Sequence, residues 1–245
     1  MKQKRRRESN VYITNKYNEL SFTNLTAKEA DVFVYILTKF KEAKDYRNSY
    51  SIEMTFEEIK RAAKIDHRVR YSEYPKMIND LTDHLAATYG TLYCEEDETI
   101  EKFPIFVNQR ISLRNQTVKF TLNERCLDML DFVNNKYTAF SLTDFVSLKG
   151  IYTKRLYCAL KQFDNTGRRM IDVGDLRDLM GYDGDEYKKL KEKAILPALD
   201  RLRGLPEFSQ LTINEIKDGR SVKTVMFDYR MKMDSIKFNP DDLPF

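Results

Sequence analysis

The residue types that most often perform chemistry in proteins are few and scattered in this sequence. Its two histidines, His67 and His84, fall at opposite ends of one expected helix, about 25 Å apart at about 1.5 Å of rise per residue. At that separation they cannot share one metal ion, so no metal site is expected. The cysteines, Cys94, Cys126 and Cys158, are widely spaced and odd in number. This pattern favours reduced, partly buried thiols and a cytoplasmic protein.

Motifs for catalysis on nucleotides or acyl groups are also missing. With only 8 glycines, the sequence contains no GxxxxGK[ST] loop that could cradle phosphates. No serine or cysteine lies in the Gly-x-Ser-x-Gly setting of a nucleophile elbow. Carboxylates are interleaved with lysines along the expected helix surfaces, which is typical of solvated faces rather than of acid–base pairs. We therefore expect a protein that is not an enzyme and that uses no cofactor.

The densest cluster of chemically active side chains is cationic and lies at the start of an expected helix, in the run EYKKLKEK at 186–193. If Tyr187 and Leu190 are buried, Lys188 and Lys191 project outward. The helix dipole favours acids at this end, so lysines here break a local preference, as residues at functional sites often do. The run predicts contacts to DNA bases and phosphates, and a solvated lysine face is the alternative. The candidates are Lys188, Lys189, Lys191 and Lys193.

Further candidate DNA contacts surround the elements expected beside this helix. Some lie at a hairpin turn around Asp218-Gly219, where a wing would follow the phosphate backbone. Others lie on the preceding helix and just before a short strand. This second-half set comprises Lys217, Arg220, Lys223, Lys154, Arg155, Arg168 and Arg169.

The first half offers a weaker set, for which a solvated surface is an equally good interpretation. Its members precede or lie on an expected third helix, or lie on an expected wing: Arg68, Arg70, Lys76, Asn79, Arg110 and Arg114. The leading run Lys4-Arg5-Arg6-Arg7 is interpreted as a disordered tail, with an arm that contacts DNA as the alternative.

The elements that would position these residues follow one order in the first half. An apolar stripe predicts a helix over 26–40, and Thr55 with Glu58 forms the capping box of a second helix. A third helix is expected over about 70–87, with Pro75 in its first turn. Extended segments are expected at 50–54, 91–94, 103–107 and 117–122.

The second half repeats this order. Helices are expected over 144–163, 175–180 and 186–203, the last kinked at Pro197. Strands are expected at 170–173, 211–216 and 222–229. The repeat predicts an α+β fold of two tandem winged-helix domains, at 1–137 and 138–245, the second ending in a short C-terminal tail.

Composition sets limits on this interpretation. Hydrophobic residues make up 42% of the chain, which is enough to form hydrophobic cores. No apolar run is long enough to span a membrane, so no membrane partner is expected. The net charge is only +4, so an interaction with DNA has to depend on where the cations lie.

The second half contains, in order, a series of short motifs: Phe140-Ser141-Leu142, Leu148-Lys149-Gly150-Ile151-Tyr152-Thr153-Lys154-Arg155-Leu156-Tyr157, Ile171-Asp172-Val173, Met180-Gly181, Tyr187-Lys188-Lys189-Leu190-Lys191 and Gly219-Arg220-Ser221-Val222. In this order and spacing they resemble the second domain of initiator (Rep) proteins of theta-replicating iteron plasmids. The first half resembles that family mainly through 26–40 and 117–122. One departure is that this chain has lysines where the family often has arginines on the second recognition helix, and lysine discriminates guanine less well.

The resemblance implies a bacterial plasmid initiator that binds double-stranded DNA, as a monomer on direct origin repeats and as a homodimer on an inverted repeat of its own gene. It also implies autorepression, dimerisation through the first domain, iteron binding mainly through the second, and recruitment of the host replication initiator and helicase. Two other functions remain open: a transcriptional repressor with no role in initiation, and a winged-helix scaffold for protein interactions.

Overall fold

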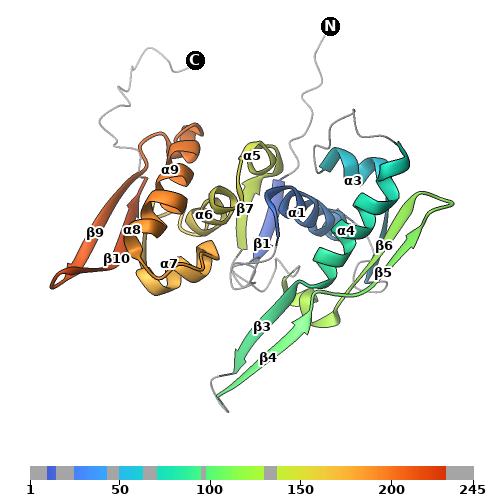
Figure 1. Ribbon diagram of the computed structural model, residues 1–245, viewed down its shortest axis with the longest axis horizontal. Coiled ribbons are helices and arrows are strands. Elements are labelled where there is room, and N and C mark those ends of the chain that lie inside the picture. Colours follow the sequence, from blue (N-terminus) through green and yellow to red (C-terminus); the bar gives the residue numbers. More distant parts are fainter. Residues whose placement is uncertain are drawn as a thin grey trace, which may run out of the picture.

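The computed structural model describes residues 10–14, 25–42, 50–62, 71–94, 98–129 and 137–229. Helices and strands alternate along the chain in an order that occurs twice (Figure 1). The predicted α+β architecture of two tandem winged helices is confirmed. Arg68, Arg70, the Lys4–Arg7 run and the C-terminal tail lie outside the described residues.

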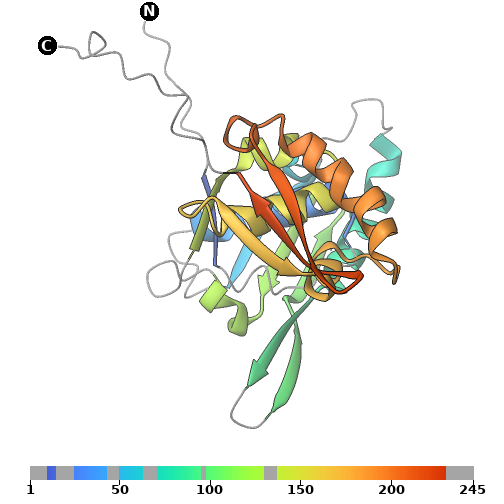
Figure 2. The ribbon, with the colours of Figure 1, turned by 90° about the vertical axis from the view of Figure 1, so that its left-hand side faces the viewer.

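The first unit contains a helix, a strand, two helices and a closing hairpin. These are α1 (Ala27–Glu42), β2 (Ser51–Thr55), α3 (Phe56–Ala62), α4 (Tyr74–Ala86, preceded by a 3₁₀ turn, Tyr71–Glu73), β5 (Phe106–Ser112) and β6 (Thr117–Leu122). Between α4 and β5, a separate hairpin projects away from the body in both ribbon views (Figures 1 and 2). It consists of β3 (Tyr89–Cys94) and β4 (Thr99–Pro104).

The second unit repeats the order. Its elements are α6 (Ile151–Lys161), β8 (Arg168–Asp172), α7 (Val173–Met180), α8 (Tyr187–Leu190), α9 (Leu196–Leu202), β9 (Thr212–Asp218) and β10 (Ser221–Asp228). A π-helical turn, Lys191–Ile195, joins α8 to α9, and a 3₁₀ turn, Pro206–Phe208, follows α9.

The two units share one sheet topology. The strand order is β2-β6-β5 in the first and β8-β10-β9 in the second, with antiparallel pairing throughout. In each unit, the strand after the first helix pairs with the last strand of that unit. The last two strands of the unit form the wing. The wings point toward opposite ends of the molecule in Figure 1, and Figure 2 views the second sheet face on. This shared order is what the repeated sequence pattern predicted.

Two further strands and a short helix lie between the units. β1 (Asn10–Thr14) pairs antiparallel with β7 (Tyr137–Ser141), and α5 (Leu142–Ser147) follows directly. The expected domain boundary at 137/138 therefore falls within a strand. The division at 137/138 remains a prediction.

Local chemistry explains where several helices begin and end. The backbone N–H of Thr55 donates to the Glu58 carboxylate at 2.9 Å and the N–H of Glu58 donates to Thr55 Oγ1 at 3.2 Å, which is the predicted capping box. Thr26 and Glu29 form a second capping box at the start of α1. Helix α7 ends at Gly181, which has φ +57°, a left-handed conformation that glycine adopts without a Cβ clash.

Three sequence predictions are corrected. The helix expected over 144–163 is two helices, because the chain is extended at Leu148 and turns through Gly150 at φ +86°. The strand expected over 103–107 belongs to two different hairpins, β3–β4 and β5–β6. In the wing of the second unit Asp218 pairs with Ser221, so the two loop residues are Gly219 and Arg220 rather than Asp218 and Gly219.

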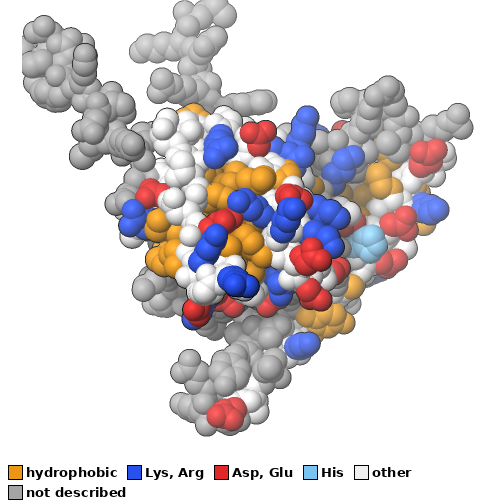
Figure 3. Space-filling model, turned by 60° about the vertical axis from the view of Figure 1, so that its left-hand side comes forward, with side chains coloured by type: hydrophobic (Ala, Val, Ile, Leu, Met, Phe, Trp, Pro, Cys, Tyr) orange, Lys and Arg blue, Asp and Glu red, His pale blue; other side chains and the backbone are white. Residues whose placement is uncertain are grey.

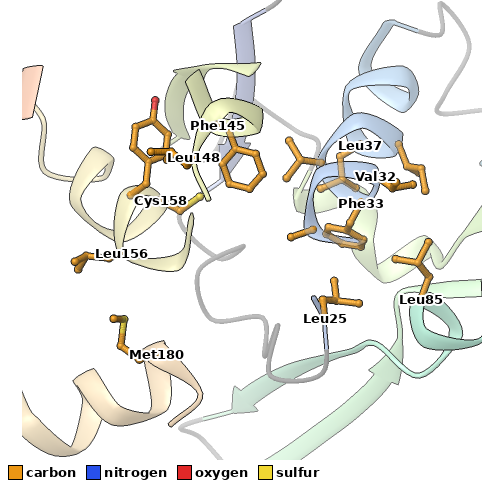
Figure 4. Close-up of a cluster of buried hydrophobic side chains, with 14 of the residues drawn as sticks. Leu25, Val32, Phe33, Leu37, Leu85, Phe145, Leu148, Leu156, Cys158 and Met180 are labelled. Carbon is orange, nitrogen blue, oxygen red and sulfur yellow. The ribbon is translucent and has the colours of Figure 1, made fainter. Parts of the chain in front are cut away.

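One continuous cluster of buried side chains runs through both units. In the first unit, Phe106 packs against Phe33 and Phe120, with ring centroids 5.8 and 5.5 Å apart. Figure 4 shows α1 between Leu85 on one side and Phe145 and Leu148 on the other, so α1 contributes to the contact between the units. None of the helices within the described ranges is long and apolar enough to cross a membrane.

Candidate nucleic-acid interface

The third helix of the second unit runs from α8 through the π-turn into α9. Its inward face is apolar and fully covered: Leu190, Ala194, Ile195, Ala198, Leu199 and Leu202. Pro197 lies in the first turn of α9, and the wider π-turn comes just before it. The irregularity expected at Pro197 is thus a π-turn placed upstream of the proline.

The four lysines of this helix have different surroundings. Lys188 and Lys193 are exposed, and neither has an ion-pair partner among the described residues. Lys189 is also exposed and contacts Glu186 of the same helix at 3.1 Å. Lys191 is half-buried instead of projecting outward, because its Nζ contacts Glu215 of β9 at 2.7 Å. That expectation is therefore corrected.

Glu215 links the helix to the wing. It accepts a hydrogen bond from Tyr187 Oη at 2.8 Å in addition to the contact with Lys191. The hydrogen bonds from Lys191 and Tyr187 lower the pKa of Glu215, and partial burial raises the pKa of Tyr187. Since Glu215 lies on β9, these contacts fix the wing against the first turn of the helix. Nothing in the sequence pairs Glu215 with Lys191, and sequence reasoning missed it.

The wing beyond this junction carries exposed cations. Lys217 lies at the end of β9, Arg220 in the loop and Lys223 on β10, and all three side chains are exposed. Gly219 has φ +59°, which lets the hairpin close in two residues. Figure 3 shows Lys and Arg side chains gathered over this face, with acidic and hydrophobic side chains between them.

Lys154 and Arg155 are buried, so the structure removes them from the candidate set. Lys154 Nζ donates to Asp31 Oδ1 at 2.6 Å and to the Phe145 carbonyl at 2.5 Å. Arg155 donates to the Met180 carbonyl, and burial lowers its pKa to about 10. The reason is that residues 153–160 of α6 are covered on all sides, which the polar residue types did not indicate.

Arg168 and Arg169 are engaged within the protein. Arg168 contacts Asp228, its partner in the β8–β10 register, at 2.8 Å. Arg169 is half-buried, donates to the Ala159 carbonyl at 2.5 Å and lies over the ring of Phe163. Desolvation lowers the pKa of Arg169. Both side chains hold the sheet together, and Arg168 keeps part of its surface exposed.

The first unit presents a more mixed surface. Lys76 and Asn79 are exposed on α4, but the Asn79 amide donates to Asp83 at 2.9 Å. On the wing, Arg114 lies in the turn and Arg110 is paired in register with Lys119, both exposed. Like charges directly opposite each other on a sheet are destabilising, so this pair favours an anionic partner.

A protein metal site needs several His, Cys, Asp or Glu side chains that converge on one point. No cluster of three or more His, Cys, Asp or Glu side chains is found in the described ranges. Cys126 and Cys158 are free and buried, and burial raises the pKa of both thiols to about 12. Neither is placed as a nucleophile.

Family comparison agrees with this geometry. The family model described as "Initiator Replication protein, WH1" matches residues 10–161, and the one described as "Initiator Rep protein, WH2" matches residues 172–229. The chain belongs to the initiator Rep protein family. In this Rep-family chain, the WH2 match covers β10, β9, α7 and the α8–α9 helix, and the WH1 match extends through α6.

Individual relatives are more distant. "Probable replication protein rep" of Bifidobacterium longum (strain NCC 2705) is 25% identical over 158 residues, which are 64% of this chain and 51% of that protein. The match thus spans about half the length of that curated relative.

Two solved structures share the fold. The Pi initiator protein in complex with iteron DNA matches with a TM-score of 0.71 and 15% identity, over 92% of this chain and 98% of that one. Domains 2 and 3 of RctB match with a TM-score of 0.51 and 11% identity, over 84% and 82%. At these identities, the likeness concerns the fold alone.

Proposed function

We propose that this chain is a plasmid replication initiator that binds double-stranded DNA sequence-specifically at repeats in an origin. Family membership supports initiation, and the fold is that of a protein solved on iteron DNA. The observation that carries the proposal is in the second unit, where an exposed lysine face on the third helix lies beside a wing with three exposed cations.

A winged helix places its third helix in the major groove and its wing along the backbone. In that arrangement Lys188 and Lys193 would reach base edges or nearby phosphates, and Arg220 would contact phosphate at the wing tip. Glu215 would keep helix and wing at a fixed angle, so that both engage the duplex together. The second unit is therefore proposed as the main iteron-binding domain.

The first unit is proposed to add DNA contacts and to carry self-association. Its wing supplies Arg110, Arg114 and Lys119, whereas its third helix mixes Lys76 with acidic neighbours. Monomers would bind the direct repeats of the origin. Dimers would bind an inverted repeat and thereby repress the chain's own gene. The host initiator and helicase would be recruited to the origin. These finer points rest on the family, as do a cytoplasmic location and the absence of a catalytic step.

Footprinting across the DNA that flanks the gene tests the proposal. We expect protection of several direct repeats of about 20 base pairs, or two helical turns each. Lys193→Ala should weaken protection of the repeats by roughly 5-fold or more, consistent with the loss of a base or phosphate contact. Lys102→Ala, which removes an exposed lysine of β4 outside the helices and wings, is the matched control and should leave protection unchanged.

Other outcomes identify the competing functions. A protein scaffold would show no salt-dependent protection of any DNA. A repressor would protect an operator, but a plasmid that carries the gene and its flanking DNA would fail to replicate without another initiator. Either result would contradict the proposal.

A further inference from the structure

One apolar side chain interrupts the charged outward face of the third helix in the second unit. Leu196 is 42% exposed, although Ile195 before it and Leu199 three residues later are buried. Lone exposed leucines are common on protein surfaces, so exposure by itself says little. The position of Leu196 is what matters.

Leu196 lies on the same side of the helix as two of the exposed lysines. Lys189 and Lys193 are four residues apart and Leu196 is three residues further, the spacing that stacks side chains along one helix face. The opposite face is the apolar core, and Lys191 faces β9 through Glu215. The exposed residues of this helix around Leu196 are therefore Lys188, Lys189, Glu192 and Lys193.

The helical spacing of the apolar residues already leaves Leu196 off the inward stripe. Among the large hydrophobic side chains that are exposed in the described ranges, Leu196 is the one on a third helix; the others are Tyr89, Val107, Leu113, Phe163, Met170 and Ile216. A helix that enters the major groove brings such a residue against base edges. The apolar group that the major groove offers is the C5-methyl of thymine.

We propose that Leu196 is a specificity-determining residue that contacts the C5-methyl group of a thymine in each origin repeat. This inference rests on the proposed function, because it requires the third helix to lie in the major groove. Lys193, one turn earlier, binds the neighbouring guanine or phosphate. Pairing an apolar contact with an adjacent cation lets the helix distinguish thymine from cytosine at one position, because cytosine has no methyl group there.

The test replaces the methyl group without changing base pairing. Each thymine of a repeat is exchanged singly for deoxyuridine, and binding of the full-length chain is measured by fluorescence anisotropy. For the wild-type chain, affinity should fall about 4-fold at one thymine, as expected for the loss of one buried methyl-sized contact. Leu196→Ala should bind unmodified DNA more weakly and should be indifferent to deoxyuridine at that same position.

Met170→Ala is the control, since it removes an exposed apolar side chain from β8, outside the third helices and the wings. It should retain the wild-type response to deoxyuridine at every position. Circular dichroism establishes that both variants are folded.

The possible results separate the inference from the proposed function. The thymine contact is wrong if Leu196→Ala keeps the full wild-type response to deoxyuridine. It is also wrong if the wild-type chain responds at no thymine while still preferring the repeat over random duplex. In both cases the proposed function stands. If the wild-type chain does not distinguish the repeat from random duplex, the proposed function fails, and the inference with it.

Discussion

Replacing Asp31 with asparagine removes the carboxylate that balances the buried ammonium group of Lys154. Lys154 Nζ and Asp31 Oδ1 are 2.6 Å apart, and the side chains of Asp31 and Lys154 are 7% and 0% exposed. Asp31 lies on α1 and Lys154 on α6, so the pair joins the first helices of the two units. Removing one member of a buried ion pair costs about 3–5 kcal/mol of unfolding free energy.

Urea denaturation followed by circular dichroism measures this cost. Asp31→Asn and Lys154→Met should each lower the unfolding free energy by about 3–5 kcal/mol. The double variant Asp31→Leu with Lys154→Met removes both charges and should recover most of that loss, since apolar replacement of a buried pair is often close to neutral.

The same variants distinguish a role of Lys154 in the buried ion pair from a role in DNA binding. If Lys154 contacted phosphate, Lys154→Met would leave stability unchanged and would reduce the salt slope of DNA binding by about 1. That result would refute the assignment of Lys154 to the interior. Lys161→Met, on the same helix but partly exposed, is the control and should lose far less stability.

Three smaller predictions concern other parts of the molecule. A hydrogen bond and ion pair with Glu29 raise the pKa of His84 above 6.5. The stability that this pair contributes should be complete below pH 6.5 and should be lost as pH rises through the raised pKa. NMR titration should show the pKa of His84 returning toward 6.5 in Glu29→Gln. Cys126 and Cys158 should react with a thiol reagent only on unfolding, because both are buried with raised pKa values, and labelling followed by mass mapping would detect faster reaction. Gly150→Ala should lose about 1–3 kcal/mol in urea denaturation, because φ is +86° and a Cβ would lie 2.6 Å from Arg201 Nη1, and an unchanged midpoint would contradict this.

Sequence patterns predicted the fold well where the signal is local. The capping box of Thr55 and Glu58 and the alternation over 117–122 depend on neighbours within a few residues, and both appear where expected. The doubled order of elements followed from such signals. The break at Gly150 was missed, since the apolar stripe continues through 144–163 and a single glycine in a helical pattern is compatible with a helix.

The candidate interface was less predictable because it depends on contacts between distant elements. Lys154 and Arg155 have the residue types of a DNA-binding surface, but α6 is enclosed by neighbours that no local pattern reveals. Lys191 was expected to face outward, and Glu215, from another element, holds it against the wing. Lys188 and Lys193 remain exposed as expected, although their role on DNA is still a prediction.

The most direct test of the central claim is the salt dependence of binding to repeat DNA by the full-length chain. The exposed cations assigned to the second unit are Lys188, Lys189, Lys193, Lys217, Arg220 and Lys223. Together with the first wing they suggest roughly 6–9 phosphate contacts, which predicts a slope of log K against log[salt] of about −5 to −8. Arg220→Ala should make the slope shallower by about 1, and Lys102→Ala should leave it unchanged. A wild-type slope shallower than about −2 would contradict the claim that these cations bind the DNA backbone.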